Sequence, residues 1–282
     1  MHHFVARLVL GSALLHGIRA AWVWERLRAL HPLALAVCLM PDHLHLIAES
    51  ADPDEDRRRL AWTLGSYARH FHGSWTRPPP PREIPDRRHL GRQIRYVSLN
   101  PCRSGLTDDP LRWLWSTHRD LVGATADPWV TPDRLAGALQ EDPRGFLSWH
   151  HAYVSSDPTV RIDGTPVPEM PPILVADAPS VAAAAARATR FVDLYDPRGR
   201  RRMLETFFAA GRAVGRPIDQ LAAYARVPRS TAFKQAARAD DRRVAAAVRC
   251  LGDDRLLHPA DERAVTLGPR DEKSRFSALL GG

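Results

Sequence analysis

The chain is almost without lysine. Only Lys234 and Lys273 carry that side chain, so 38 of the 40 basic residues are arginine. A contact to phosphate would therefore rely on the planar guanidinium group, although a GC-rich genome also favours arginine. Cysteine is scarce too: the three cysteines are widely spaced and form no CxxC pair, which gives no indication of a zinc site or a redox dithiol.

Long apolar runs are missing as well. No segment approaches the roughly 18 to 20 apolar residues of a membrane helix. The N-terminus shows no charged, apolar and cleavable segments in succession. We therefore expect a cytoplasmic protein with no membrane partner.

The composition is otherwise that of a folded protein with a basic excess. Of 282 residues, 44% are hydrophobic and 26% charged, and the net charge is +8. Residues 57–103 hold eleven arginines against two acids, and residues 161–282 hold a second excess of positive charge. Two separate basic regions indicate either a polyanionic partner, most plausibly nucleic acid, or a solvated basic face.

Proline-rich segments divide the chain. Residues 158–180 concentrate proline and lack periodicity, which predicts a linker between a domain at 1–157 and a second at 181–282. Four prolines at 78–81 predict a stiff polyproline II stretch. Residues 253–282 contain no motif that we can interpret.

The first domain alternates strand and helix patterns. Apolar periodicity predicts strands at 3–10, 33–40 and 43–49, and helices at 17–30, 54–72 and 87–100, the last stopped by Pro101. Pro41 and Asp42 predict a tight hairpin between the second and third strands. This order predicts an α+β fold with a ferredoxin-like antiparallel sheet and helices on one face. The second domain is predicted to be wholly helical.

The hairpin carries a His-Leu-His triplet. On a strand, His43 and His45 share one face, an arrangement that suits a divalent metal or simply two surface histidines. A second triplet, His70 to His72, ends a predicted helix, where the two side chains diverge, so we discard it. The histidines at positions 2 and 3 would point to opposite faces of a strand.

A tyrosine and an asparagine lie one helical turn apart. Tyr96 and Asn100 share a face of the helix at 87–100, so the amide could reach whatever lies beside the phenol. A metal held by two histidines still needs oxygen ligands. The alternative is a tyrosine that faces the core, followed by an Asn-Pro turn at the end of the helix.

Taken together, the elements of residues 1–125 resemble the single-tyrosine HUH transposases, most closely the REP-associated tyrosine transposases. The resemblance rests on the order of three segments: the hairpin CLMPDHLHLIAE, the helix with RYVSLNPCRSGL, and the tryptophan segment LRWLWSTHRDLVG. The resemblance implies nicking and joining of single-stranded or hairpin repeat DNA. Two-strand events would need a homodimer or a DNA hydroxyl as the second nucleophile.

The resemblance also implies residue roles. His43 and His45 would bind Mg²⁺ or Mn²⁺, and Asn100 stands where the family has a polar ligand. Tyr96 would be the nucleophile, and its attack would give a 5′-phosphotyrosine and a free 3′-hydroxyl.

Two features depart from the family pattern. Asp42 replaces an asparagine that relatives commonly carry, and residues 73–87 are a short proline-rich stretch where relatives usually have an extra strand. DNA phosphates could still be held by Arg77, Arg82, Arg87, Arg88, Arg92 and Arg95. Trp113 and Trp115 could stack on unpaired bases or pack in the core, and Arg112 and Arg119 flank them.

Residues 218–239 resemble a helix-turn-helix. Leu221, Ala222 and Ala225 would form the inner face of the first helix, Val227 would be buried in the turn, and Arg226 takes the turn position usually held by glycine. The second helix would present to DNA the polar side chains of Arg229, Ser230, Thr231, Lys234 and Gln235. Two packed helices without a DNA role are the alternative.

Two rival functions stay open. A catalytically silent repeat-DNA-binding protein would keep the same scaffold. A histidine-triad nucleotide hydrolase would need HxHxH, but here the third position is Ile47.

Overall fold

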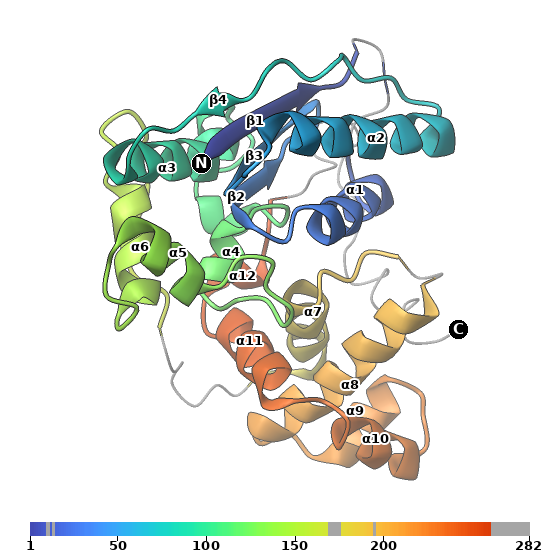
Figure 1. The fold of residues 1–282 in the computed structure, drawn as a ribbon. Helices are drawn as coiled ribbons and strands as arrows, with labels where there is room; N and C mark the ends of the chain where they lie inside the picture. Colours follow the sequence, from blue (N-terminus) through green and yellow to red (C-terminus); the bar gives the residue numbers. More distant parts are fainter. Residues whose placement is uncertain (10–11, 13–14, 169–175, 194–195, 261–282) are drawn as a thin grey trace. The chain divides into compact units, whose positions relative to one another are not determined.

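A computed structural model describes residues 1–9, 12, 15–168, 176–193 and 196–260 (Figure 1). The chain divides into two compact units: unit 1 comprises Met1–Val122 and Pro128–Pro166, and unit 2 comprises Gly123–Asp127 and Val167–Gly282. The domain limits and the linker predicted above stay predictions. Parts of the predicted linker (169–175), of the first strand (residue 10) and of the C-terminal domain (194–195 and 261–282) lie outside the described residues.

Unit 1 contains a small sheet and most of the predicted elements. In chain order they are β1 (His2–Arg7), α1 (Ile18–Leu30), β2 (Ala34–Leu39), β3 (His43–Ala48), α2 (Pro53–Phe71), β4 (Arg82–Glu83), α3 (Arg87–Arg103), η1 (Pro110–Arg112), α4 (His118–Leu121), α5 (Pro132–Leu139) and α6 (Phe146–Ser155). Helix α2 begins where Asp52 accepts a hydrogen bond from the Glu55 backbone N–H and Pro53 occupies its first turn. Asp86 caps α3 in the same way through the backbone N–H of His89.

The sheet is antiparallel, in the order β2-β3-β1-β4. The α+β class and the hairpin between β2 and β3 are thereby confirmed. Strand β4 pairs His2 and His3 of β1 with Glu83 and Arg82. The stretch 73–87 therefore does contain a strand, and the sequence-based expectation that none is present was wrong, because two residues are too few to show an alternating pattern.

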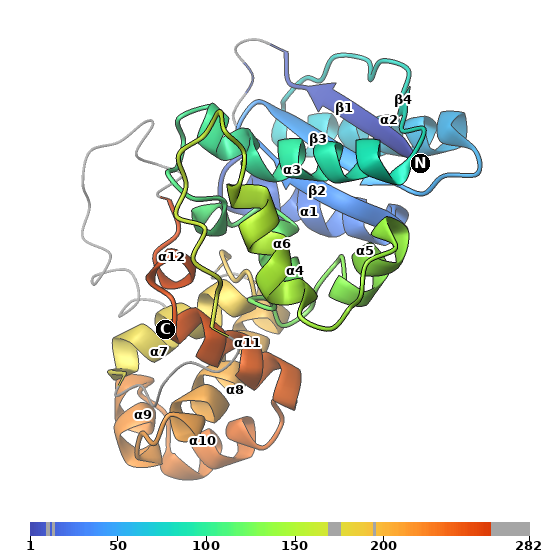
Figure 2. The ribbon, with the colours of Figure 1, turned by 90° about the vertical axis from the view of Figure 1, so that its left-hand side faces the viewer.

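Helices cover both faces of the sheet, which corrects the prediction of helices on one face. Every residue of β2 and β3 is buried. Phe4 of β1 faces His31 at the end of α1, with ring centroids 6.4 Å apart, whereas His45 faces Tyr96 of α3 on the other side. Figure 2 shows α3 across the face of the sheet that is turned to the viewer, with α1 and α2 behind it.

Helix α3 continues through Pro101, which the sequence had marked as its end. Pro101 lies in the last turn, so its missing N–H removes a single intrahelical hydrogen bond, and the helix ends at Arg103. The backbone N–H of Ser104 then donates to the Asn100 carbonyl at 3.0 Å. Asn100 accordingly lies in the last turn of α3.

The tryptophan segment closes one edge of the sheet. The N–H of Leu39 donates to the Trp115 carbonyl at 2.9 Å, and the indole of Trp113 donates to the Leu39 carbonyl at 2.8 Å. Both indoles are buried, at 2% and 1% exposure. Of the two roles considered for them, the structure selects core packing and an edge cover for β2, not base stacking. Arg119 is also fully buried and its guanidinium donates to the Leu111 carbonyl, so it is not accessible to DNA.

The described part of unit 2 contains helices and no strand. The helices are α7 (Ala178–Ala188), α8 (Pro197–Ala213), α9 (Ile218–Tyr224), α10 (Arg229–Ala236), α11 (Asp241–Leu251) and α12 (Asp254–Leu257). Alanine-rich α7 buries five of its seven alanines, and α8 buries Phe207 and Phe208. Small residues on α7 let its neighbours approach closely and exclude water from their shared core.

Helices α9 and α10 form the predicted helix pair. Leu221, Ala222 and Ala225 are buried, as the sequence predicted, and Val227 is half-buried. Arg226 adopts φ +52° in the turn between the helices. The position therefore has the left-handed backbone that usually selects glycine, and here an arginine adopts it.

In the described part of the chain, no helix has both the length and the apolar character needed to cross a bilayer.

Candidate active site and nucleic-acid interface

Three histidines gather on one face of the sheet. His43 and His45 point to the same side of β3, with ring centroids 5.0 Å apart and perpendicular planes. The Nδ1 of His45 lies 3.0 Å from the Nε2 of His3, which comes from β1. All three rings are buried, at 9% exposure or less. Sequence reasoning missed His3, although strand alternation places it, Val5 and Arg7 on one face of β1.

In both predicted metal ligands, His43 and His45, the Nδ1 atom of the ring has a hydrogen-bond partner. The Nδ1 of His43 lies 2.6 Å from the Oδ1 of Asp42, and the Nδ1 of His45 is bonded to His3. The Nε2 of His45 is buried without a hydrogen-bond partner, and no hydrogen bond reaches the Nε2 of His43 from the described residues. The Asp42 carboxylate accepts the Nδ1 proton of His43, which leaves the Nε2 of His43 as a ligand. The Nε2 of His45 is a ligand in the tautomer in which its Nδ1–H donates to His3.

Burial lowers the pKa of two of these histidines. Desolvation lowers the pKa of His45 to about 3, helped by the charges of His3 and His43. Desolvation and the charge of Arg82 lower the pKa of His3 to about 4. Both rings are therefore neutral at pH 7, which is the form that coordinates a metal ion.

Tyr96 reaches the cluster from α3. Its ring stands perpendicular to the ring of His45, with the centroids 5.7 Å apart, and 41% of the residue is exposed. The guanidinium of Arg103 lies over the same ring at 5.1 Å from its centroid and is anchored to Asp157 at 2.8 Å. The phenol thus combines a fixed ring with access to solvent. The alternative of a tyrosine that faces the core is excluded.

A cleft of about 590 Å³ opens in front of the phenol. One wall is the helix face formed by His89, Gln93 and Tyr96, and another includes Pro79 and Pro80 of the proline segment. His89 is tied to the helix cap, with its Nδ1 2.6 Å from the Oδ2 of Asp86. Sequence reasoning missed His89 and Gln93, although spacings of four and three residues place them on the helix face of Tyr96.

Asn100 and His43 do not line this cleft. Asn100 is buried, at 6% exposure, and its Nδ2 has no hydrogen-bond partner. A half-turn of the amide about the Cβ–Cγ bond would bring its oxygen to the same unpartnered position. Among the described residues, no three His, Cys, Asp or Glu side chains converge as a metal cluster.

A comparison with curated proteins finds one weak match. The chain is 25% identical over 105 residues to a Haemophilus influenzae (strain ATCC 51907 / DSM 11121 / KW20 / Rd) protein whose name assigns it provisionally to the REP-associated tyrosine transposases. The match covers 31% of this chain and 60% of that protein. It supports a distant transposase-like relationship. No family model matches the chain, and no solved structure matches it.

The predicted phosphate-binding arginines are distributed over two clefts. Arg82 lines the cleft in front of Tyr96. Four others, Arg87, Arg88, Arg92 and Arg95, line a neighbouring cleft of about 440 Å³ on the next face of α3. Arg77 is exposed at the start of the proline segment, and Arg112 is half-buried with its Nε 3.3 Å from Asp108. Their contacts to DNA remain predictions.

The residues predicted to read DNA in unit 2 lie on α10. Ser230 and Lys234 are exposed, whereas Thr231 and Gln235 are half-buried. Arg229 is also exposed, and its Nε lies 3.0 Å from Asp219 of α9. The positions suit a recognition helix, but an ion pair already engages one of the five side chains.

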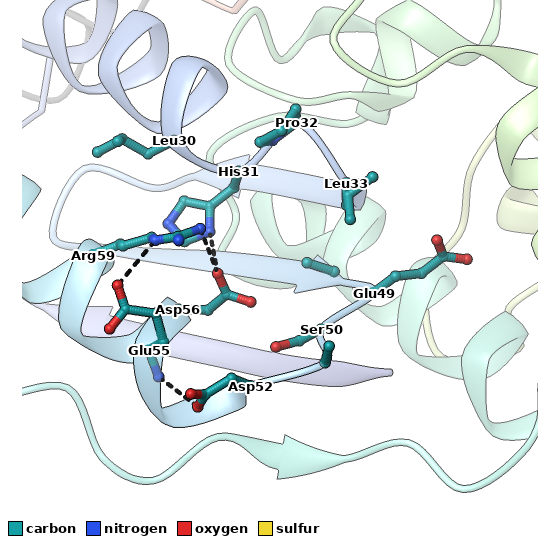
Figure 3. Close-up of a pocket in the computed structure, with 12 residues that line it drawn as sticks. Leu30, His31, Pro32, Leu33, Glu49, Ser50, Asp52, Glu55, Asp56 and Arg59 are labelled. Carbon is teal, nitrogen blue, oxygen red and sulfur yellow. Dashed lines mark hydrogen bonds and ion pairs between the residues drawn. The ribbon is translucent and has the colours of Figure 1, made fainter.

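A smaller cleft of about 270 Å³ lies beside the N-terminus of α2 (Figure 3). Its lining includes four carboxylates, Glu49, Asp52, Glu55 and Asp56, against a single arginine. Arg59 pairs with Glu55 at 3.2 Å and with Asp56 at 3.6 Å. Arg58 also pairs with Glu55 at 2.9 Å and with Asp52 at 3.9 Å. Carboxylates outnumber arginines in the lining, so this cleft favours a phosphate less than the arginine-lined clefts of α3 do.

Proposed function

We propose that the protein is a metal-dependent, single-tyrosine endonuclease and strand transferase that acts on single-stranded DNA at hairpins or repeats. The observation that carries the proposal is the phenol of Tyr96 beside the buried His45 in a solvent-open cleft. The weak likeness to a transposase supports the same chemistry. The HUH family fold is part of this proposal.

The phenol oxygen of Tyr96 would attack the scissile phosphorus. A new bond forms between this oxygen and phosphorus, and the bond from phosphorus to the 3′-oxygen breaks. The proton lost by the phenol leaves to solvent through the open cleft, and the departing 3′-oxygen takes a proton to become a hydroxyl. The phosphotyrosine keeps the energy of the phosphodiester, so attack by a DNA hydroxyl can rejoin the strand without a nucleotide cofactor.

The residues fit a divalent ion. His45 offers a neutral, buried and unpartnered Nε2, His43 offers its own Nε2, and Asn100 offers an amide with an unpartnered atom. These three side chains would hold Mg²⁺ or Mn²⁺, which when bound would polarise the scissile phosphate. Asp42 and His3 would keep the two imidazoles in the required orientation.

The positive regions would hold the DNA. The arginines along α3 and Arg82 would neutralise phosphates near Tyr96, and α10 would dock a hairpin or repeat in a groove. Because each chain carries one such tyrosine, two linked cleavages would need a homodimer or a DNA hydroxyl as the second nucleophile.

A labelling experiment tests the chemistry. The protein is incubated with Mn²⁺ and single strands taken from the DNA that flanks its gene, labelled at either end. A 5′-phosphotyrosine predicts that the 3′-end label becomes attached to protein and that the 5′-end label appears on a shorter free strand. Tyr96→Phe should abolish the attachment, and chelation of the metal should prevent it. Tyr224→Phe is the matched control that should retain it, because Tyr224 packs against Phe207 in unit 2 and lines neither cleft.

An adduct that persists in Tyr96→Phe would refute the nucleophile assignment. Tight binding without an adduct on any flanking strand would instead identify a silent repeat-DNA-binding protein.

A further inference from the structure

The second cleft on α3 combines arginines with an exposed aromatic stack. It is lined by Arg87, Arg88, Gly91, Arg92 and Arg95 of α3, by Leu139 and Glu141 at the end of α5, and by Trp149 and Tyr153 of α6. Four guanidinium groups against one carboxylate make its lining strongly positive. The lining therefore suits a polyanion that also presents flat rings.

Two aromatic rings form a flat platform in this cleft. The rings of Trp149 and Tyr153 are 5.1 Å apart and nearly parallel, at 9°. They are one helical turn apart on α6, and Trp149 is 38% exposed, in contrast to the buried indoles of Trp113 and Trp115. The ring of Phe146 also lies near the indole, 5.2 Å away and tilted by 42°, so the indole is held between two aromatic neighbours and its exposed part is what it can offer to another ring.

Arg95 of α3 holds the Tyr153 ring of this platform in place. The guanidinium of Arg95 lies over the Tyr153 ring at 5.3 Å, and its Nε is 3.4 Å from Asp157. A Cβ built on Gly91 would lie 3.0 Å from the Tyr153 hydroxyl, so the glycine permits this close approach of α6 to α3. Arg95 therefore supports the stack and is not a free phosphate ligand.

Other arginines of the cleft are unpaired. Arg88 and Arg92 are exposed, and neither has an ion pair in the described part of the chain. Arg87 donates to the side-chain oxygen of Gln140 at 2.8 Å, a neutral partner. Arg87 and Arg88 also occupy the first turn of α3, where the helix dipole disfavours cations. The N-cap carboxylate of Asp86 is bonded to His89, and no ion pair joins it to either arginine in the described part of the chain. An anionic ligand would satisfy all three.

Helix geometry connects this cleft to the nucleophile. Arg88, Arg92 and Arg95 are spaced by four and three residues, and His89, Gln93 and Tyr96 follow the same spacing one position later. The two faces are therefore about 100° apart around one helix. A strand whose phosphates lie on Arg88 and Arg92 would run directly beside Tyr96.

We infer that this cleft is a subsite for unpaired nucleotides of single-stranded DNA, in which Trp149 stacks on a base and Arg88 and Arg92 hold the adjoining phosphates. The inference rests on the proposed function, since it names how that site recognises its substrate. In a duplex the bases stack on one another and present no face to Trp149, so the subsite selects single strands.

Equilibrium binding tests the inference in the cleavage-silent Tyr96→Phe chain. A fluorescently labelled single strand and the matching blunt duplex are titrated by fluorescence anisotropy. Trp149→Ala should raise the single-strand Kd by roughly 5- to 150-fold and leave the duplex Kd within about twofold. Trp149→Phe should recover most of the affinity, because it restores an aromatic face and shows that the site is folded. The double variant Arg88→Gln, Arg92→Gln should reduce the salt dependence of binding.

Trp62→Ala is the matched control, because Trp62 is 56% exposed on α2 and lines neither cleft. Equal single-strand affinities for Trp149→Ala and Trp62→Ala would overturn the inference, whether or not Tyr96 forms an adduct. A loss specific to Trp149→Ala would support the subsite even if no adduct forms. In that second case the proposed cleavage would fail while the subsite stands.

Discussion

Replacing His150 by phenylalanine should remove a pH-dependent loss of stability from unit 1. His150 lies on α6 and is fully buried, and neither of its ring nitrogens has a hydrogen-bond partner. Its ring stacks on Phe146 at 5.4 Å and 17°, and the ring of His118 lies 5.1 Å away. Burial lowers the pKa of His150 from 6.5 to about 3, with a smaller contribution from His151.

The sign and size of the effect follow from proton linkage. Below pH 6.5 the unfolded chain takes up a proton at His150 and the folded chain does not, so folding loses stability as the pH falls toward 3. The loss is about 1.4 kcal/mol for each pH unit, or about 2 kcal/mol between pH 6.5 and 5. Above pH 6.5 both states are neutral and the contribution is constant. Against a typical domain stability of about 5 to 15 kcal/mol, this difference is measurable.

Urea unfolding followed by tryptophan fluorescence is the suitable assay, because all eight tryptophans belong to unit 1. His150→Phe keeps a planar ring against Phe146, and any packing cost that it introduces is the same at every pH. The wild-type free energy of unfolding should therefore fall more steeply than that of the variant between pH 6.5 and 5. The exposed Leu33, changed to Ala, carries no titrating group and serves as the control that should keep the wild-type slope. Identical slopes for wild type and His150→Phe would refute the reasoning.

Two further predictions concern unit 2 and are measured by circular dichroism, which also detects the tryptophan-free helices. Arg226→Gly should raise the free energy of unfolding by about 0.5 to 1 kcal/mol. Glycine removes the cost of a left-handed backbone, which is about 1 to 2 kcal/mol for an L-residue, but the unfolded chain gains conformational entropy, and this offsets part of the stabilisation. Arg226→Ala keeps a Cβ and should show no such gain; an equal gain would contradict the role of backbone strain. Gly211→Ala should destabilise unit 2 by about 1 to 3 kcal/mol, because its Cβ would lie 2.5 Å from the Cδ1 of the fully buried Leu221. Gly137→Ala, whose Cβ meets open space on α5, is the matched control, and an equal loss in both variants would exclude the packing explanation.

The local elements could be predicted because their signals are local. Alternation along β3 places His43 and His45 on one face, and the Pro41-Asp42 turn predicts the hairpin. Helical spacing places Tyr96 one turn before Asn100. These patterns follow from the repeats of strands and helices and need no knowledge of the rest of the chain.

Contacts between elements far apart in the sequence could not be predicted from local patterns. His3 bonds His45 across 42 residues because β1 pairs antiparallel with β3, and no local pattern encodes that register. Because α3 packs on the opposite face of the sheet from α1, Tyr96 contacts His45 instead of the core. The tryptophan segment hydrogen-bonds to the edge strand β2, and this buries Trp113 and Trp115.

By itself, then, the sequence determined the first three strands and the first three long helices, the two-histidine strand face, and the helix pair with its turn at Arg226. Only the tertiary structure decided which arginines are buried, which are paired and which face an open aromatic stack. The physical reason is that periodicity within an element follows from backbone geometry, whereas burial and pairing depend on which elements meet.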